Sequence, residues 1–574
     1  MQPVNPELLH GTKLKGESIM AGPIAPKDPQ EKRPGFYVLL DKPVGGIPQD
    51  DGKGKHSVFI NRERLPSFAK VTGGITDEKI LALLTTASGF RELVHSIGVS
   101  LTASDPKLTA DFSLMFRGVG GEGSNHHFRI PCDGTENTIC LDELTWSRYD
   151  AEPAELRFEF PASSDTASAS VKFYVNDGFD VPPSVPEPEP DFGSTGYREL
   201  IARSFLSAGN NAAVQRFLRR AKAGEEVSVA FLGGSITQGA GAVPLQENCY
   251  PFLTVQGLRE RYGEKIRYLK AGVGGTPSET GLMRYERDIT RNGTVQPDLV
   301  VLEFAVNDAG DETEGIFYES LVRKILRAPN QPAVILLFAV FSDDWNLKQR
   351  LAPIGYRYQL PMADILEAVV PQFYDADKRV ITKRQYFYDV FHPANAGHRI
   401  MADSLLYLIE RLEQQQPDLP PAGTVPPVYG DDFEDLQFFD RSSCPEDVTV
   451  IPGSFTAKDM NLQCVPLDAD AYNTPMFPHN WKKEPGDAAF TLEITCRRLV
   501  LEFKDSGSTA FGKALVTVDG EKQRLLDPQE AGWTHCHSAV LFNRRESAPH
   551  KVEISVLPED ADKTFTILGF GYVP

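Results

Sequence analysis

The sequence is poor in cysteine and contains no C-x-x-C pair. Its 574 residues include seven cysteines, an odd number, at positions 132, 140, 249, 444, 464, 496 and 536. Structural disulfides are therefore not required, and reduced thiols suit a cytoplasmic protein. The first residues also lack the basic start and apolar core of a secretory signal peptide. We therefore expect a cytoplasmic location.

Long apolar runs and an excess of basic residues are missing as well. The longest uninterrupted apolar run, residues 333–341, is about half as long as the ~20 residues that a helix needs to cross a bilayer. Lys and Arg number 59 against 79 Asp and Glu, which gives a net charge of −20. Nucleic acids and anionic membranes are bound by basic surfaces. We therefore expect neither a nucleic acid nor a membrane as a partner.

A chain of this length is too long for one hydrophobic core, and prolines divide it. At about 150 residues per domain, three or four domains are expected. Residues 182–190 hold five prolines and residues 417–427 repeat the pattern, which favours extended spacers because proline cannot join a helix or a central strand. The predicted parts are an N-terminal extension 1–33, a domain 34–181, a linker 182–193, a domain 194–412, a linker 413–429 and a domain 430–574.

The two outer domains show the alternation that is typical of half-buried β-strands. Apolar and polar side chains alternate in residues 156–160 and again in residues 552–556. The dipeptide Asp519-Gly520 is a strong hairpin signal. We expect antiparallel β-sandwiches of the jelly-roll kind at both ends of the chain.

The middle domain follows a different pattern. Continuous apolar runs at residues 227–234, 298–306 and 333–341 alternate with helical segments. Strands that are apolar on both faces are typical of a parallel sheet with helices on each side. The pattern predicts a doubly wound, flavodoxin-like α/β domain, in which chemistry takes place at the carboxyl ends of the strands.

Two glycine-containing segments follow strands of this domain. The run 227–234 ends at two glycines followed by Ser235, so the serine hydroxyl can stand exposed as a nucleophile. The alternative is that Ser235 only caps the helix that follows. The loop 271–276 follows a short predicted strand, and its glycines let backbone N–H groups approach an anion. It lacks the lysine and the spacing of a phosphate-binding loop.

Two further polar elements lie at strand or loop ends. Asn307 directly follows the run 298–306, and an amide there can donate a hydrogen bond to an oxyanion without bringing charge. Asp389 and His392 are three residues apart and precede Pro393, which we expect to be the first residue of a helix. A histidine oriented by a carboxylate can activate a hydroxyl. The alternative is that Asp389 only caps the turn and His392 is merely polar.

In this order the segments GGSIT, GVGGT, AVND and DVFHP resemble the sequence blocks of the SGNH subgroup of the GDSL-type esterases and lipases. The resemblance covers residues 227 to about 405. The serine block departs from the family's title motif, because no aspartate precedes the serine. The glycine block leaves Gly274 and Gly275 as alternative oxyanion donors, and alignment on Thr276 favours Gly275.

The resemblance implies a role for each matched residue. Ser235 would be the nucleophile, His392 the base and Asp389 the group that orients the base. The oxyanion would be held by the N–H groups of Ser235 and Gly275 and by the Asn307 side chain. This mechanism needs no metal and no cofactor, and we expect none.

Two β-sandwiches around such a domain look like the architecture of carbohydrate esterases. The resemblance therefore favours deacetylation of an acetylated carbohydrate, such as a xylo-oligosaccharide, with a small-molecule or oligosaccharide ester as the partner. Trp345 and Tyr250 could stack on a sugar, and core packing is the alternative for both. The competing functions are an esterase for aryl, thio or lipid esters and a non-catalytic carbohydrate-binding protein. The oligomeric state stays open, a homo-oligomer included.

Histidines at two further places in the sequence are not predicted to belong to a functional site. The tripeptide His535-Cys536-His537 looks like a metal cluster, but side chains alternate along a strand, so the two histidines share a face while Cys536 points away. We interpret these three as ordinary strand residues and predict no metal site. His398 is interpreted as part of a helix surface.

Overall fold

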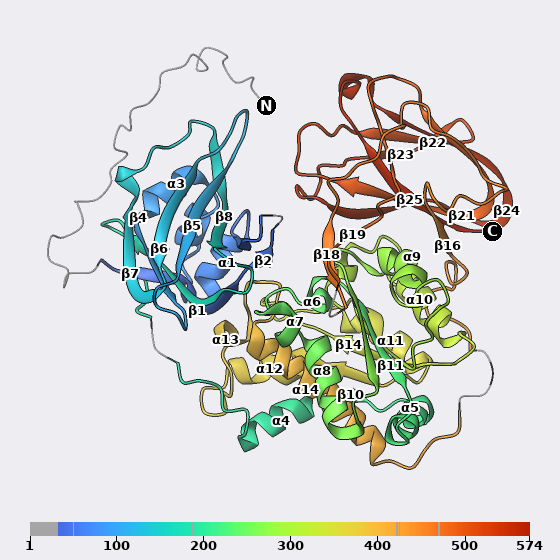
Figure 1. Ribbon diagram of the computed structural model, residues 1–574, viewed down its shortest axis with the longest axis horizontal. Coiled ribbons are helices and arrows are strands. Elements are labelled where there is room, and N and C mark those ends of the chain that lie inside the picture. The colour runs from blue at the N-terminus through green and yellow to red at the C-terminus, as the bar shows by residue number, and fades with distance from the viewer. Residues whose placement is uncertain (1–32, 50, 185–186, 421–422, 424, 469–470) are drawn as a thin grey trace. The chain divides into compact units, whose positions relative to one another are not determined.

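The computed structural model describes residues 33–574 except 50, 185–186, 421–422, 424 and 469–470. The segment in which we looked for a signal peptide, and nearly all of the predicted N-terminal extension, lie outside the described residues. The chain forms two compact units (Figure 1). One contains the residues up to Pro190 together with Thr382–Ala394, and the other contains Asp191–Ile381 and Asn395–Pro574. The segment Thr382–Ala394 therefore groups with the N-terminal domain, although the predicted boundaries assign it to the middle domain.

The N-terminal unit is built from two antiparallel sheets around one hydrophobic core. The first sheet has the order β1 (Gly35–Gly45), β9 (Thr166–Val175), β4 (Val94–Thr102) and β7 (Asp133–Cys140). The second has the order β2 (Ile47–Pro48), β3 (Gly54–Phe59), β8 (Asp150–Phe160), β5 (Thr109–Gly118) and β6 (Asn125–Pro131). Helices α1 (Arg64–Val71), α2 (Glu78–Leu83) and α3 (Ala87–Leu93) complete the core. The short helix α13 (Lys383–Tyr386) lies in the segment Thr382–Ala394, which groups with this unit.

The second unit contains a six-stranded sheet, most of which is parallel. Its order is β10 (Phe205–Ser207), β15 (Met362–Asp364), β14 (Ala333–Phe338), β13 (Leu299–Glu303), β11 (Val227–Gly233) and β12 (Ile266–Gly272). Only the edge strand β10 runs antiparallel to its neighbour. Every residue of β11, β13 and β14 is buried, as expected for strands covered on both faces. The flavodoxin-like α/β domain that the apolar runs predicted is therefore confirmed.

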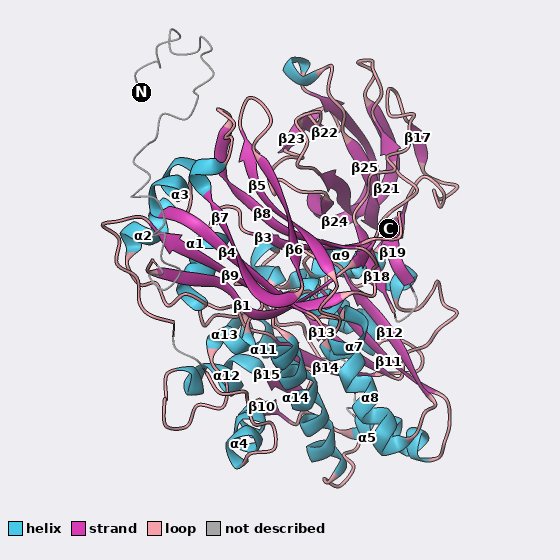
Figure 2. Ribbon diagram, turned by 60° about the vertical axis from the view of Figure 1, so that its left-hand side comes forward, coloured by secondary structure: helices cyan, strands magenta, loops and turns pink. Residues whose placement is uncertain are grey.

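Helices pack on both faces of this sheet (Figure 2). On one face, Leu232 and Leu302 share a core with residues of α9 (Ser278–Asp288), α10 (Ile316–Leu326) and α11 (Lys348–Arg357). On the other face, Phe231 contacts Tyr250 of α8 (Tyr250–Tyr262), which packs against α14 (Asn395–Glu413). The remaining helices are α4 (Thr195–Arg203), α5 (Ala212–Lys222), α6 (Ser235–Gln238), α7 (Leu245–Asn248) and α12 (Ile365–Phe373).

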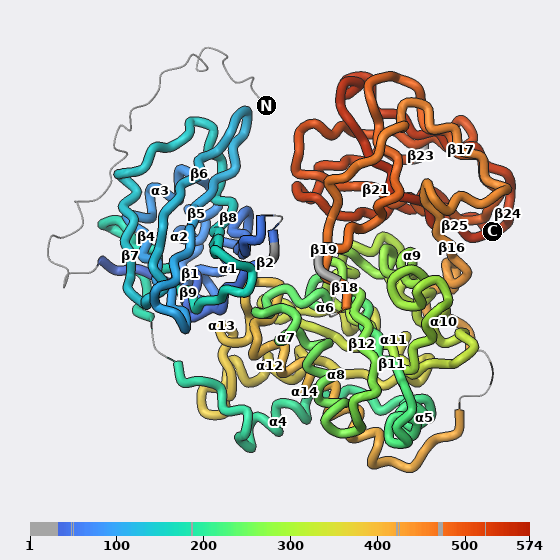
Figure 3. The backbone as a smooth tube through the Cα atoms, viewed as in Figure 1, coloured from blue at the N-terminus to red at the C-terminus, as the bar shows by residue number. Residues whose placement is uncertain are grey.

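The C-terminal part of the second unit is an antiparallel β-domain. Its main sheet contains β16 (Gln437–Phe439), β25 (Thr566–Val573), β21 (Phe490–Asp505), β24 (His535–Val556), β22 (Ala514–Val518) and β23 (Glu521–Leu526), with β17 (Thr449–Ile451) and β20 (Trp481–Lys482) paired to it. A small separate sheet, β18 (Cys464–Leu467) and β19 (Ala471–Pro475), lies with β18 beside β12 and α6 (Figure 3). The expected β-rich domains on both sides of the α/β domain are confirmed.

Two local predictions can be compared with the structure. Asp519 and Gly520 both have positive φ angles, 55° and 83°, between β22 and β23, as a tight hairpin turn requires. The helix expected to begin at Pro393 begins at Asn395 instead. Pro393 bridges back to Phe387 in a closed turn, so it precedes the helix.

Among the described residues, no helix combines the length and the apolar character needed to cross a membrane.

Candidate active site

The carboxyl ends of three neighbouring strands lie at the same level in the central sheet. Gly233 at the end of β11 pairs in register with Gly272 of β12 and with Glu303 of β13. The segments that follow these strands carry Ser235, the glycine loop and Asn307. The sheet therefore brings three of the four predicted sequence blocks to one edge, as the rule for parallel sheets predicts.

Ser235 is the first residue of α6 and is half-buried. The residue before it, Gly234, leaves no room for a side chain, because a Cβ atom there would lie 1.9 Å from Oδ1 of Asn307. Gly234 has an ordinary φ of −87°, so space rather than backbone strain requires glycine here. The Asn307 amide thus packs on the backbone that leads into Ser235. With its buried Oδ1 turned to Gly234, the Nδ2 group is left to donate elsewhere.

The glycine loop lies beside Ser235, and its two candidate donors differ. The Gly274 N–H donates to Oε1 of Gln238 at 2.8 Å, so it is already engaged. A Cβ atom on Gly274 would lie 3.7 Å from Cβ of Ser235. Gly275 has a φ of +76°, and within the described chain its N–H has no hydrogen-bond acceptor. The geometry therefore favours Gly275 over Gly274 as the N–H that can face an anion.

The C-terminal β-domain contacts this loop directly. Buried Gln463 donates its Nε2 group to the carbonyl of Gly274 at 2.8 Å, and its Oε1 accepts the N–H of Cys536 at 3.1 Å. The ring of Trp533 leaves no space for a side chain at Gly275, where a Cβ atom would lie 2.7 Å from Cζ2. Trp533 is nevertheless 42% exposed. The β-domain therefore supports the glycine loop and presents an aromatic ring beside it.

Two buried ionisable side chains hold the strand ends. Glu303 accepts a hydrogen bond from the hydroxyl of Thr237 in α6 at 3.2 Å, and burial raises the pKa of Glu303 to about 8. Arg284 of α9 is fully buried and donates to the carbonyls of Gly233 at 2.8 Å and of Ala271 at 2.7 Å. Arg284 therefore fixes the backbone just before the predicted nucleophile and at the start of the glycine loop, and Glu303 holds the side chain of Thr237 just after the nucleophile.

The two aromatic residues predicted to bind a sugar lie in different surroundings. Tyr250 is fully buried, its hydroxyl lies 2.8 Å from Oγ1 of Thr237, and its ring stacks on that of His398. Because Tyr250 cannot touch a substrate, its prediction as a binding residue is wrong. His398 is also fully buried rather than on a helix surface. Trp345 is 36% exposed and stacks on Phe341, so its role stays a prediction.

Asp389 and His392 form a closed turn in the N-terminal unit. Nδ1 of His392 lies 2.9 and 2.8 Å from the two carboxylate oxygens, and the backbone N–H groups of Phe391 and His392 donate to the same carboxylate at 2.8 Å. Burial by itself raises the pKa of Asp389, but His392, these hydrogen bonds and the nearby Arg64 hold it below its usual value. The carboxylate therefore stays ionised and fixes the proton on Nδ1, which leaves Nε2 as the basic atom.

The N-terminal domain holds this turn through buried polar contacts. Lys42 of β1 donates its Nζ to the carbonyl of Phe387 at 2.5 Å and to that of Arg384. The ring of His56 shares a 2.5 Å hydrogen bond between its Nε2 and the hydroxyl of Tyr388. Tyr388 belongs to the hydrophobic core of the N-terminal domain. The flanking domain therefore positions the predicted acid–histidine pair.

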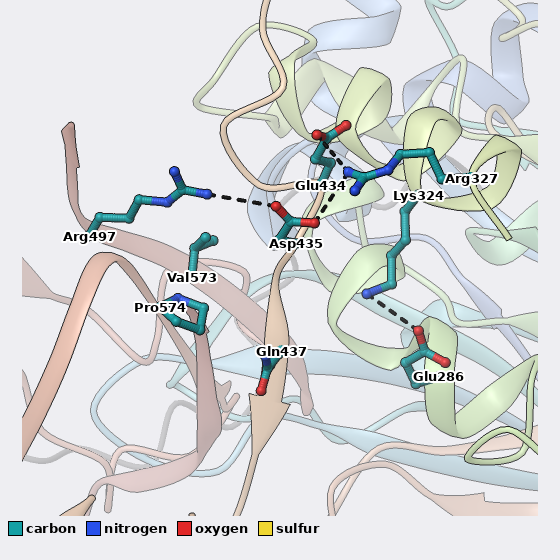
Figure 4. Close-up of a pocket in the computed structure, with 9 residues that line it drawn as sticks. All are labelled: Glu286, Lys324, Arg327, Glu434, Asp435, Gln437, Arg497, Val573 and Pro574. Carbon is teal, nitrogen blue, oxygen red and sulfur yellow. Dashed lines mark hydrogen bonds and ion pairs between the residues drawn. The ribbon is translucent and has the colours of Figure 1, made fainter. Parts of the chain in front are cut away.

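A separate charged pocket in the second unit takes no part in this site (Figure 4). Its side chains pair with one another: Arg497 with Asp435 at 3.7 Å, and Arg327 with Glu434 at 2.7 Å. The lining consists of Glu286, Lys324, Arg327, Glu434, Asp435, Gln437, Arg497, Val573 and Pro574. None of these residues was predicted to act in a site, and ion pairs neutralise most of their charge.

The sequence of the middle domain matches a known family. Residues 231–400 match the model of the GDSL-like lipase/acylhydrolase family, and they include all four predicted sequence blocks. Residues 231–400 form a GDSL-like lipase/acylhydrolase domain. The protein is therefore a carboxylic ester hydrolase in which this domain is flanked by two β-rich domains.

Solved structures match a larger share of the chain than the GDSL-like domain alone. A two-domain esterase (CEX) active on acetylated mannans, co-crystallised with mannopentaose, is 26% identical with a TM-score of 0.56, and the match covers 65% of this chain and 98% of that chain. A second structure of such an esterase is 25% identical with the same TM-score, over 65% and 99% of the two chains. An acetyl xylan esterase, AlAXEase, is 21% identical over 32% of this chain and 98% of that chain, with a TM-score of 0.27. None of the curated proteins matches.

Sequence reasoning missed the residues through which the flanking domains support the GDSL-like domain and its histidine turn. Gln463 and Trp533 carry no local pattern, because their roles depend on contacts with residues far away in the chain. Lys42 carried a weak signal. It shares the inward face of β1 with Val44, where alternation predicts an apolar residue, and both side chains are buried.

Proposed function

We propose that the protein is a serine esterase that removes acetyl groups from carbohydrates through an acyl-enzyme on Ser235. The observation that carries this proposal is the close packing of Asn307 on Gly234. It places an amide beside the start of α6, and the N–H of Gly275 is free for an anion on the neighbouring loop. Preorganised donors beside a serine are what a tetrahedral oxyanion requires.

In the proposed reaction, Oγ of Ser235 attacks the ester carbonyl and passes its proton to Nε2 of His392. Asp389 stabilises the imidazolium that forms. The N–H groups of Ser235 and Gly275 and the Nδ2 group of Asn307 hold the oxyanion. When the C–O bond breaks, the leaving alcohol takes the proton from His392, and a water molecule then repeats the cycle on the acyl-enzyme.

The choice of substrate rests on similarity. The two-domain esterase that is 26% identical over 65% of the chain is active on acetylated mannans. Its match extends beyond the length of the GDSL-like domain alone. Acetylated manno-oligosaccharides are therefore the first substrates to test, with acetylated xylo-oligosaccharides second. The cytoplasmic location expected from the sequence favours oligosaccharides over intact polymers.

The test measures acetate release from acetylated manno- and xylo-oligosaccharides by the full chain, with p-nitrophenyl acetate and p-nitrophenyl palmitate in parallel. We expect the acetyl substrates to be cleaved and the palmitate to be left intact. Ser235→Ala and His392→Ala should lower kcat by about 10⁴-fold or more. The exposed His479 provides a matched control, and His479→Ala should keep full activity.

Three results would overturn the proposal at different levels. Full activity of Ser235→Ala would remove the nucleophile and with it the mechanism. Cleavage of the palmitate with the acetylated oligosaccharides untouched would keep the mechanism but make the protein a lipid esterase. A protein that binds the oligosaccharides and hydrolyses no ester would be a carbohydrate-binding protein.

A further inference from the structure

The end of β21 and the start of β24 lie side by side in the C-terminal β-domain. In the antiparallel register, Asp505 pairs with His535 and Phe503 pairs with His537. Because alternate side chains of a strand share a face, Asp505, His535 and His537 point to one face, and Cys536 points to the other. One ligand atom from each of these three residues lies within 4.8 Å of the other two.

This cluster contains buried polar atoms whose hydrogen-bonding capacity is unused. The side chain of Asp505 is 0% exposed, and its Oδ1 atom is buried without a hydrogen-bond partner in the described chain. Its Oδ2 atom accepts the N–H of Ala531 at 3.0 Å and lies 3.7 Å from Nδ1 of His537. Nδ1 of His537 is buried and lacks a hydrogen bond as well. Such atoms are costly unless another group satisfies them.

The two imidazoles are already held in orientations that suit ligation. Nδ1 of His535 lies 3.3 Å from the carbonyl oxygen of Trp533, which can accept its proton and leave the lone pair on Nε2. The ring of His535 stacks on Trp533, and that of His537 stacks on Phe503. The side chain of His537 is 33% exposed, which gives an ion a path from solvent.

We propose that Asp505, His535 and His537 bind a divalent transition-metal ion, with Zn²⁺ as the preferred ion. Two imidazoles and one carboxylate are typical Zn²⁺ ligands, and a water molecule can take the fourth position of a tetrahedral site. The sequence interpretation of the two histidines as ordinary strand residues did not include Asp505, which the sheet brings to them from 30 residues away. Residue pairing across strands, not a short motif, forms the site.

The ion would join the end of β21 to the start of β24, next to the segment that packs on the glycine loop. A Cβ atom on Gly275 would lie 2.7 Å from Trp533 and 3.6 Å from Cδ2 of His535. The segment that carries these two rings is therefore packed on the loop. A bound ion would hold this segment in place, and this role does not depend on which ester the protein hydrolyses.

The experiment uses the full chain, treated with a chelator and then dialysed. Calorimetric titration with Zn²⁺ should show one equivalent bound, and Zn²⁺ should raise the melting temperature. His537→Ala and Asp505→Asn should each weaken Zn²⁺ binding by about 100-fold or more. His479→Ala, which removes an exposed histidine elsewhere in the domain, should bind Zn²⁺ like the wild type.

Co²⁺ serves as a spectroscopic probe of the ligands. The Co²⁺ form should show the visible absorption of a tetrahedral site without a thiolate charge-transfer band, and Cys536→Ala should leave this spectrum unchanged. A wild-type protein that binds no stoichiometric Zn²⁺ or Co²⁺ would overturn the proposal. Equal affinity in the wild type, His537→Ala and Asp505→Asn would also overturn it. The partly exposed His537 is expected to tolerate substitution, and circular dichroism checks that each variant is folded.

Discussion

Replacing Gly234 by alanine tests the oxyanion geometry without touching any group that would react. A Cβ atom at this position would lie 1.9 Å from Oδ1 and 2.5 Å from Cγ of Asn307, while real Cβ contacts are essentially never shorter than 3.0 Å. The amide must therefore move by about 1 Å or more. Displacement of one oxyanion donor costs about 10²- to 10³-fold in kcat, or roughly 2.7–4 kcal/mol. We expect a loss of this size in kcat for acetyl ester hydrolysis, with KM nearly unchanged.

The matched control is Gly310→Ala, because a Cβ atom there meets nothing within 4 Å, and this variant should keep wild-type kcat. Asn307→Ala should reproduce the loss of Gly234→Ala, and the double variant should be little worse than either single variant, since both remove the same donor. Wild-type kcat in Gly234→Ala would refute the placement of Asn307. Fully additive losses would show that Gly234 acts through something other than the amide.

Three further predictions concern the buried ionisable groups. Arg284→Met leaves the carbonyls of Gly233 and Ala271 without their buried donor and should lower the free energy of unfolding by about 3–5 kcal/mol, measured by denaturant titration. Burial raises the pKa of Glu303 from 4.5 to about 8, so the folded state binds the proton more tightly, and the free energy of unfolding should fall as pH rises from about 4.5 to 8. Glu303→Gln should flatten this fall in denaturant titrations across that pH range. An unchanged slope would contradict the assignment. Burial lowers the pKa of Lys42 from 10.5 to about 7, so the folded state releases this proton at lower pH than the unfolded state, and the free energy of unfolding should rise between about pH 7 and 10.5. The Lys42→Met variant should lack this rise. Its kcat should also fall, because the turn that carries His392 is no longer held.

Much of the α/β domain could be predicted from the sequence, because strands covered on both faces leave continuous apolar runs. The runs that begin at Val227 and Ala333 became β11 and β14. The predicted strand 333–341 was too long, because the chain leaves the sheet after Phe338, while Ala339 and Val340 remain fully buried. An apolar run reports burial, and only hydrogen-bonding partners decide where a strand ends.

The contacts that support the site could not be predicted in the same way. Lys42 and Phe387 are 345 residues apart, and Gln463 and Gly274 are 189 apart. Each contact joins a side chain to a backbone carbonyl, which every residue possesses, so no motif marks the acceptor. The four sequence blocks were visible because the chemistry proposed for them requires particular residue types at particular spacings. The residues that support them need only a polar side chain long enough to reach a backbone carbonyl.

These contacts offer a reason why the proposed reaction, whose residues lie between 235 and 392, takes place in a chain of 574 residues. The carbonyl of Gly274 is held by Gln463, and the turn before His392 is held by Lys42, so each flanking domain fixes one part of the proposed catalytic set. The flanking domains also share cores with what they support: Phe433 and Val500 pack in the same cluster as residues of β11 and α10. Removing the C-terminal domain would expose that cluster to water as well as release the glycine loop. The flanking domains therefore support the proposed catalytic residues, and a substrate-binding role for them would be additional.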